Sequence, residues 1–149
     1  MQVRGTIYHH SSLTFHNGFV GKKYLVLLNT PSNNEPYLFV KATSQEKTRP
    51  KTPGCIKGLS LFFVPAGKAF FPKNTWIQLY DIYEIEPNKV DRKAGVTLEG
   101  TLSAKMIDDV VNCLFECESE NIPQNRKDLL RPPMIDALQK LKARFDSCR

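Results

Sequence analysis

The chain has 149 residues, of which 41% are hydrophobic and 24% charged, a composition that favours one folded domain and excludes a disordered chain. Its net charge of +6 favours contact with nucleic acid or with an acidic partner. No apolar run reaches the length of about 18 residues that a membrane-spanning helix needs. Residues 1–5 also lack the profile of a secretory signal. We therefore expect a cytoplasmic protein that makes no membrane contact.

The chain contains four cysteines, which by number alone could form two disulfides: Cys55, Cys113, Cys117 and Cys148. None of their spacings matches the CxxC or Cys/His patterns that are typical of zinc sites. Thiols of cytoplasmic proteins generally stay reduced. The sequence therefore predicts free thiols, no metal site and no cofactor.

The first half of the chain alternates short β-type runs with clusters of turn residues. The run over 23–29 is apolar almost throughout, which indicates a strand buried on both faces, as in a small closed barrel. The prolines and asparagines of 31–36 predict a tight turn. We expect polar loops over 9–21 and 45–54. The predicted strands cover residues 3–8, 23–29, 37–44, 59–64, 69–71 and 75–80.

The last third of the chain changes to helical periodicity. Ser103 is the expected N-cap of a helix, and Leu102 is in position to pack onto Ile107. After a polar stretch over 118–127, Pro132–Pro133 opens a second predicted helix. The apolar stripes of the two helices are Ile107, Val110, Val111 and Leu114, and Met134, Leu138, Leu141 and Phe145.

Short strands followed by helices predict a mainly β fold with C-terminal helices, built as a small β-barrel capped by helix. We assign the barrel and its helix to residues 1–118. Residues 119–149 are expected to form a helical extension that packs on the same domain.

Five segments share their order and spacing with one known family. They are Gly5–Tyr8, Gly21–Leu28, Val40–Gln45, Trp76–Glu86 and Gly100–Ser103. The second is similar to a Gly-x-Arg-Pro-Val-x-Val strand, the third to a Pro-Ile-Thr-Ser segment, and the last to Gly-x-Leu-Ser. Over residues 4–117 the chain thus resembles the MazF/PemK family of ribonuclease toxins from bacterial toxin–antitoxin pairs.

The resemblance implies an SH3-like barrel and a homodimer that cleaves single-stranded RNA without a metal ion. In such a reaction the RNA 2′-hydroxyl attacks the phosphodiester, and the enzyme supplies a proton acceptor, cations and a proton donor. The resemblance also implies restraint by an acidic antitoxin protein, which suits the net charge of +6.

For the active site, the resemblance implies the catalytic residues Lys23, Thr43 and Ser44, and we add His16 as the histidine best placed for proton transfer. Lys23 stands where the family has an arginine, so it keeps the charge but lacks the bidentate fork that holds phosphate. Asp81 loosely matches a carboxylate that some members place after the late strand. The predicted RNA-binding residues are Lys22, Lys41, Lys47, Arg49 and Lys51.

Each of these residues also has an interpretation without a functional role. Thr43 and Ser44 have hydroxyls of the kind that cap turns. Lys22, Lys23 and the basic residues of 45–54 have the character of solvated charges, and His16 that of an ordinary loop residue. We interpret Trp76 and the phenylalanines at 62, 63, 70 and 71 as core or dimer contacts rather than as base-stacking residues.

Two other functions remain open on the sequence alone. The first is a catalytically weak or inactive barrel that binds RNA or a partner protein, which the lysine at position 23 favours. The second is a regulatory protein whose groove takes only a partner peptide. RNA binding without cleavage would indicate the first, and no RNA affinity at physiological salt would indicate the second.

Overall fold

The computed structural model describes residues 3–14, 20–32, 34–86 and 96–131. The chain divides into two units, Met1–Ser119 and Glu120–Arg149, one residue from the predicted boundary. In the second unit the described helix is α3 (Gln124–Leu130), which follows Pro123 at its N-cap. A short 3-10 turn, η2 (Ser119–Asn121), lies at the boundary between the units. Whether the extension packs on the first unit stays a prediction.

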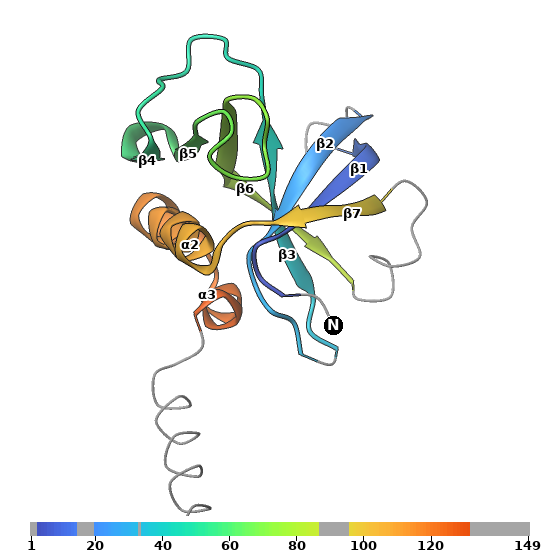
Figure 1. Ribbon diagram of the computed structural model, residues 1–149. Coiled ribbons are helices and arrows are strands. Elements are labelled where there is room, and N and C mark those ends of the chain that lie inside the picture. Colours follow the sequence, from blue (N-terminus) through green and yellow to red (C-terminus); the bar gives the residue numbers. More distant parts are fainter. Residues whose placement is uncertain (1–2, 15–19, 33, 87–95, 132–149) are drawn as a thin grey trace, which may run out of the picture. The chain divides into compact units, whose positions relative to one another are not determined.

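The described strands of the first unit form one antiparallel sheet (Figure 1). Their order across it is β4-β5-β6-β3-β2-β1-β7, and a 3-10 turn, η1 (Lys57–Leu59), joins β4 to β5. The strands are β1 (Thr6–Thr14), β2 (Val20–Leu27), β3 (Tyr37–Thr43), β4 (Gly54–Ile56), β5 (Leu61–Val64), β6 (Thr75–Ile85) and β7 (Val96–Thr101).

A mainly β fold with C-terminal helices is therefore confirmed, but the closed barrel is not. The strands β4 and β7 lie at opposite ends of the strand order, and among the described residues no ladder joins them. The SH3-like assignment accordingly stays a prediction. β3 is the middle strand of the order, and its first four residues are buried, as expected for a strand covered on both faces.

The first predicted loop was wrong at both ends. β1 continues through His9 and His10 to Thr14, and β2 already begins at Val20. Both histidines pair with β2 on one side and with β7 on the other. Hydrogen bonds to β2 and β7 therefore satisfy the backbone of this segment, although its polar side chains had suggested a loop.

Strand limits also differed near β6 and β7. The predicted strand over 69–71 is irregular, with bends at 69 and 70, while β6 extends to Ile85 instead of ending at residue 80. β7 was not predicted, because it is a partly exposed edge strand whose partner, β1, lies at the other end of the first unit's sequence. Gly100 allows Phe70 to approach it, since a Cβ at residue 100 would lie 2.8 Å from the Phe70 ring.

The first predicted helix is confirmed as α2 (Ala104–Glu118). The Ser103 hydroxyl accepts a hydrogen bond from the Met106 backbone N–H at 3.2 Å. The buried side of α2 packs against β4, β5 and β6 (Figure 1). In the described part of the chain, no helix combines the length and apolar character needed to cross a membrane. The second predicted helix, from Pro132, lies outside the described residues, and α3 occupies part of the stretch we expected to be irregular.

The prediction of reduced thiols is wrong for two of the cysteines. Cys55 on β4 forms a disulfide with Cys113 on α2, across a sequence separation of 58 residues. The cross-link joins the helix to the sheet's edge strand. Sequence spacing gave no indication of it, because only the packing of α2 over β4 brings the two residues together.

Removal of the α2 cap should destabilise the domain. Ser103→Ala leaves the Met106 N–H without its side-chain acceptor, and we expect the free energy of unfolding to fall by about 1 kcal/mol. Ser103→Asn, which retains a capping oxygen, should stay close to the original value. Urea unfolding at constant pH measures both. Equal losses in the two variants would contradict a capping role.

Candidate functional site

The candidate site is centred on a contact between the middle of β2 and the C-terminal end of β3. The Lys23 ammonium donates a hydrogen bond to the Thr43 hydroxyl at 3.3 Å. The antiparallel ladder pairs Tyr24 with Ala42, so that Lys23 and Thr43 are the next residues along their strands. Thr43 is buried and Lys23 is half-buried. The structure therefore brings together two of the residues predicted to be catalytic.

Thr43 also has the turn-capping role that we had considered as an alternative. Its Oγ1 accepts a second hydrogen bond, from the Gln45 backbone N–H at 3.2 Å, as in a Ser/Thr turn. The two interpretations hold together, because one oxygen with two lone pairs can accept both bonds. Ser44, the third predicted residue, is exposed beside it.

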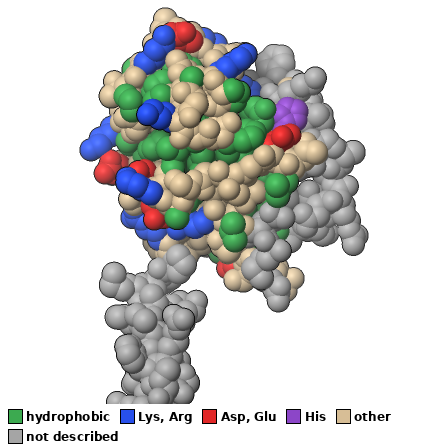
Figure 2. Space-filling view, viewed as in Figure 1, with side chains coloured by type: hydrophobic (Ala, Val, Ile, Leu, Met, Phe, Trp, Pro, Cys, Tyr) green, Lys and Arg blue, Asp and Glu red, His purple; other side chains and the backbone are tan. Residues whose placement is uncertain are grey.

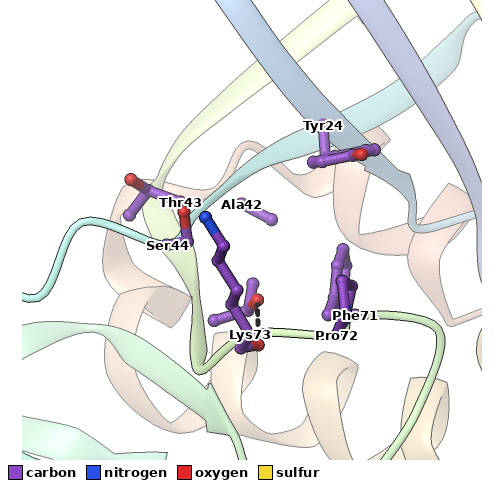
Figure 3. A pocket seen from close by; sticks show the side chains of 8 residues that line it. Tyr24, Ala42, Thr43, Ser44, Phe71, Pro72 and Lys73 are labelled. Atoms are coloured by element: carbon purple, nitrogen blue, oxygen red, sulfur yellow. Dashed lines mark hydrogen bonds between the residues drawn. The ribbon is translucent and has the colours of Figure 1, made fainter. Parts of the chain in front are cut away.

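Two adjoining hollows open at this end of the sheet. The first, of about 280 Å³, is lined by His9, Lys23 and Gln45 together with four residues that also line the second. The second, of about 190 Å³, adds Phe71, Pro72, Lys73 and Thr75 (Figure 3). The four shared residues are Tyr24, Ala42, Thr43 and Ser44.

The second hollow has an aromatic side and a basic side. The rings of Tyr24 and Phe71 meet nearly edge to face, with centroids 5.8 Å apart. From the opposite side the Lys73 side chain extends toward the end of β3 that carries Thr43 and Ser44 (Figure 3). The hollow thus combines an apolar wall with an ammonium group, as a binding site for a flat anionic ligand requires.

Positive charge is concentrated around Lys23. Burial lowers the pKa of the Lys23 ammonium from its ordinary value, and repulsion from Lys41, Arg49 and Lys47 lowers it further, in that order. Three of the predicted RNA-binding residues are therefore electrostatic neighbours of the predicted catalytic lysine. An anion bound here would reduce the repulsion between these side chains.

A carboxylate lies beside this cluster. Lys41 forms an ion pair with Asp81, with 3.8 Å between Nζ and Oδ2, and the side chains are only 12% and 21% exposed. The Tyr83 hydroxyl donates to the same oxygen at 3.2 Å, and the Lys41 ammonium lies 5.6 Å from the centre of the Tyr83 ring. Lys41 is therefore less available as a simple phosphate contact than its sequence position suggested.

A shift of register in the sheet positions Asp81. Val40 of β3 pairs with Ile82 of β6, but the next residue, Lys41, pairs with Gln78. Residues 79–81 are thus extra on the β6 side, as in a bulge that re-aims side chains. The sequence had matched Asp81 to the site only loosely, and nothing in its strand pattern indicated this irregularity.

The loop between β3 and β4 carries the remaining predicted cations. The Pro50 carbonyl accepts a hydrogen bond from the buried Trp76 indole at 2.8 Å, which ties the loop to β6 and confirms Trp76 as a core residue. Arg49 donates to the Gln45 carbonyl, and Lys51 forms an exposed ion pair with Glu46. Across the face in Figure 2, Lys and Arg side chains are scattered among apolar surface and form no continuous patch.

Two predicted residues cannot be compared with the site. His16 lies outside the described residues, and Lys22 belongs to β2 but its side chain is not described. Sequence reasoning missed His9, which lines the first hollow beside Lys23. The His9–His10 pair was the available signal, because strand alternation turns neighbouring side chains to opposite faces.

Comparison with known proteins adds no assignment. No protein-family model matches this chain, and no curated protein is significantly similar to it. The geometry of the site is therefore the basis for a functional proposal.

Substitution of a neighbouring cation should raise the pKa of Lys23. Arg49→Gln removes one of the charges that lower it, while burial, the largest cause, remains, so the pKa should rise but stay below its ordinary value. An NMR titration of the Lys23 side chain measures the change. Lys51→Gln is the matched control, because Lys51 is not among those charges. An equal rise in both variants, or none in Arg49→Gln, would contradict the proposed cluster.

Proposed function

We propose that this chain is an endoribonuclease that cleaves single-stranded RNA without a metal ion. The observation that carries the proposal is the Lys23–Thr43 contact beside a hollow, surrounded by further cations. The resemblance to MazF/PemK toxins led to the same pair of residues from the sequence. A cationic cluster next to a hollow with an aromatic wall suits a phosphate with its attached base.

The proposed chemistry divides the work among the described side chains. The Lys23 ammonium and the Thr43 hydroxyl bind the oxygens of the phosphate as negative charge develops on attack by the 2′-hydroxyl. Arg49 adds charge from the adjacent loop. His9 lines the same hollow, and we assign it the proton transfer from the 2′-hydroxyl to the leaving 5′ oxygen. His16, predicted from the sequence, is the alternative for this role.

The proposal also extends to partners and location. A net charge of +6 suits an acidic antitoxin segment that covers the cationic hollow and blocks RNA. The proposed working form is a homodimer, and the proposed location is the cytoplasm, where the RNA substrate and the antitoxin would be present.

Purified protein should cleave single-stranded RNA in the presence of EDTA. Products should carry a 2′,3′-cyclic phosphate, because the attacking group is the 2′-hydroxyl, and DNA of the same sequence should stay intact. Lys23→Ala and Thr43→Ala should each lower the cleavage rate by roughly 100-fold or more, as removal of a transition-state hydrogen-bond donor does. Denaturing gels and a phosphatase-resistance assay measure both results.

Two control variants distinguish a general loss of positive charge from the loss of a catalytic group. Lys105→Gln removes one exposed positive charge on α2 and should leave the cleavage rate unchanged. Lys23→Arg should keep substantial activity, because the guanidinium retains the charge. Undiminished cleavage in both alanine variants would remove the site assignment, and an absence of cleavage with retained RNA binding would favour the second candidate.

The second candidate is a protein with the same groove that binds RNA, or a partner protein, without turnover. Two observations favour it: Lys23 lacks the bidentate fork of an arginine, and the Lys41 charge is partly neutralised by Asp81. In that case the cations hold phosphate but do not stabilise a transition state.

RNA cleavage and RNA binding without cleavage both predict salt-dependent RNA binding at this site. Arg49→Gln should weaken binding and reduce the slope of log K against log salt by about 0.7, the value for one phosphate contact on a single strand. Lys105→Gln should leave the slope unchanged. Fluorescence anisotropy with a labelled RNA at several salt concentrations gives the slopes. No RNA affinity near physiological salt would contradict both RNA cleavage and RNA binding, and would favour a groove that takes a partner protein or peptide.

A further inference from the structure

A cluster of three cysteine sulfurs lies between β4 and α2. Cys55 comes from β4, whereas Cys113 and Cys117 are one helical turn apart on α2. The Cys117 Sγ is 3.9 Å from the Sγ of Cys55 and 3.9 Å from the Sγ of Cys113. All three sulfurs lie within 4.8 Å of one another. No metal-site spacing is visible in the sequence, because Cys55 comes from a separate strand far from the other two cysteines.

The position of the Cys117 thiol is unfavourable for attack on the disulfide. Thiol–disulfide exchange needs the attacking sulfur in line with the bond that breaks. A thiol in that position would be nearer to one sulfur than to the other by about the length of the bond, roughly 2 Å. The Cys117 Sγ is equally far from both sulfurs, so it lies beside the bond instead of along it.

The same spacing suits three ligands around one metal ion. Zinc binds thiolate sulfur at about 2.3 Å in tetrahedral geometry, so two sulfurs on one zinc ion lie about 3.8 Å apart. The distances from Cys117, 3.9 Å to each of the other sulfurs, match this edge. Only the separation of Cys55 from Cys113 must lengthen, and it does so when their disulfide is reduced.

We propose that the reduced chain binds one Zn²⁺ ion through Cys55, Cys113 and Cys117. A dithiol supplies two electrons and two protons to the Cys55–Cys113 bond and leaves as a disulfide. The three thiols then each lose a proton as the zinc–sulfur bonds form. Among the described residues no carboxylate or imidazole joins the three sulfurs within 4.8 Å, so a water molecule completes the tetrahedron.

The surroundings of the cluster leave a path for an ion. Cys113 is buried, with only 2% of its surface exposed, while Cys55 and Cys117 are partly exposed and leave a path for the ion. The Ser60 hydroxyl donates to the Glu118 carboxylate at 3.1 Å, which keeps that carboxylate engaged next to Cys117. The zinc ion would replace the disulfide as the cross-link between β4 and α2 when the chain is reduced.

The test is a zinc titration of the full chain in two redox states. Protein reduced with a phosphine, which competes for zinc less strongly than a dithiol does, should retain one zinc ion per chain after gel filtration, as measured by elemental mass spectrometry. The oxidised protein should retain none. Co²⁺ in place of zinc should give the near-ultraviolet charge-transfer absorption of thiolate ligation. Because each cobalt–thiolate bond adds to this absorption, its intensity should correspond to three bound sulfurs.

The variants distinguish a shared site from separate thiols. Cys117→Ser keeps the disulfide-forming pair, so its oxidised form provides a test of folding. Its reduced form should lose zinc affinity by more than the roughly 10–100-fold that loss of an outer-sphere partner costs. Cys148→Ser, at the remaining cysteine, should bind zinc like the original chain. Zinc binding that survives Cys117→Ser, or that is lost equally in Cys148→Ser, would overturn the proposal, as would reduced protein that retains no zinc. None of these results depends on whether the chain cleaves RNA.

Discussion

The structure depends on the pairing of β3 with a neighbour on each side. β2 and β6 satisfy the backbone of β3, and its apolar residues are buried, so its register is strongly determined. The register with β2 brings Thr43 next to Lys23, and the register with β6 brings Lys41 next to Gln78. A slip of one residue would turn Thr43 to the opposite face and separate it from Lys23. The candidate site is therefore a direct consequence of strand pairing.

The irregular part of the β3–β6 pairing places a negative charge, Asp81, beside these cations. The bulge after Val40 leaves Asp81 beside Lys41, where a regular ladder would have continued without extra residues. Like charges that are partly buried repel each other more strongly than charges in water. Asp81 relieves part of this repulsion at Lys41, whereas burial and three cations lower the pKa of Lys23. This imbalance leaves net positive charge at the end of β3, and the proposed binding of a phosphate rests on that charge.

Local signals in the sequence predicted part of the fold well. β3 was predicted to within one residue, and α2 was predicted with its cap, because turn residues and a capping serine act over a few positions. His9 and the Cys55–Cys113 pair were not predicted, since their environment comes from β7 and α2, which are distant in sequence. Of the candidate site, the sequence predicted the central pair, Lys23 and Thr43, and it did so only through the family resemblance. Phe71, which completes the hollow's aromatic wall with Tyr24, and Lys73 come from the irregular segment before β6, which has no strand or helix period.

The net charge of +6 is a weaker argument for anion binding than the arrangement of a few cations. Elsewhere in the described chain, several basic side chains form ion pairs on the surface, such as Lys105 with Asp109 and Lys57 with Glu116. Exposed pairs of this kind contribute little field, because water and salt screen them. Around Lys23 the described charges that shift its pKa are all positive, and the group is partly removed from water. Because screening is weaker there, these few side chains would decide where the proposed phosphate is held, and the overall charge would decide only how readily it approaches.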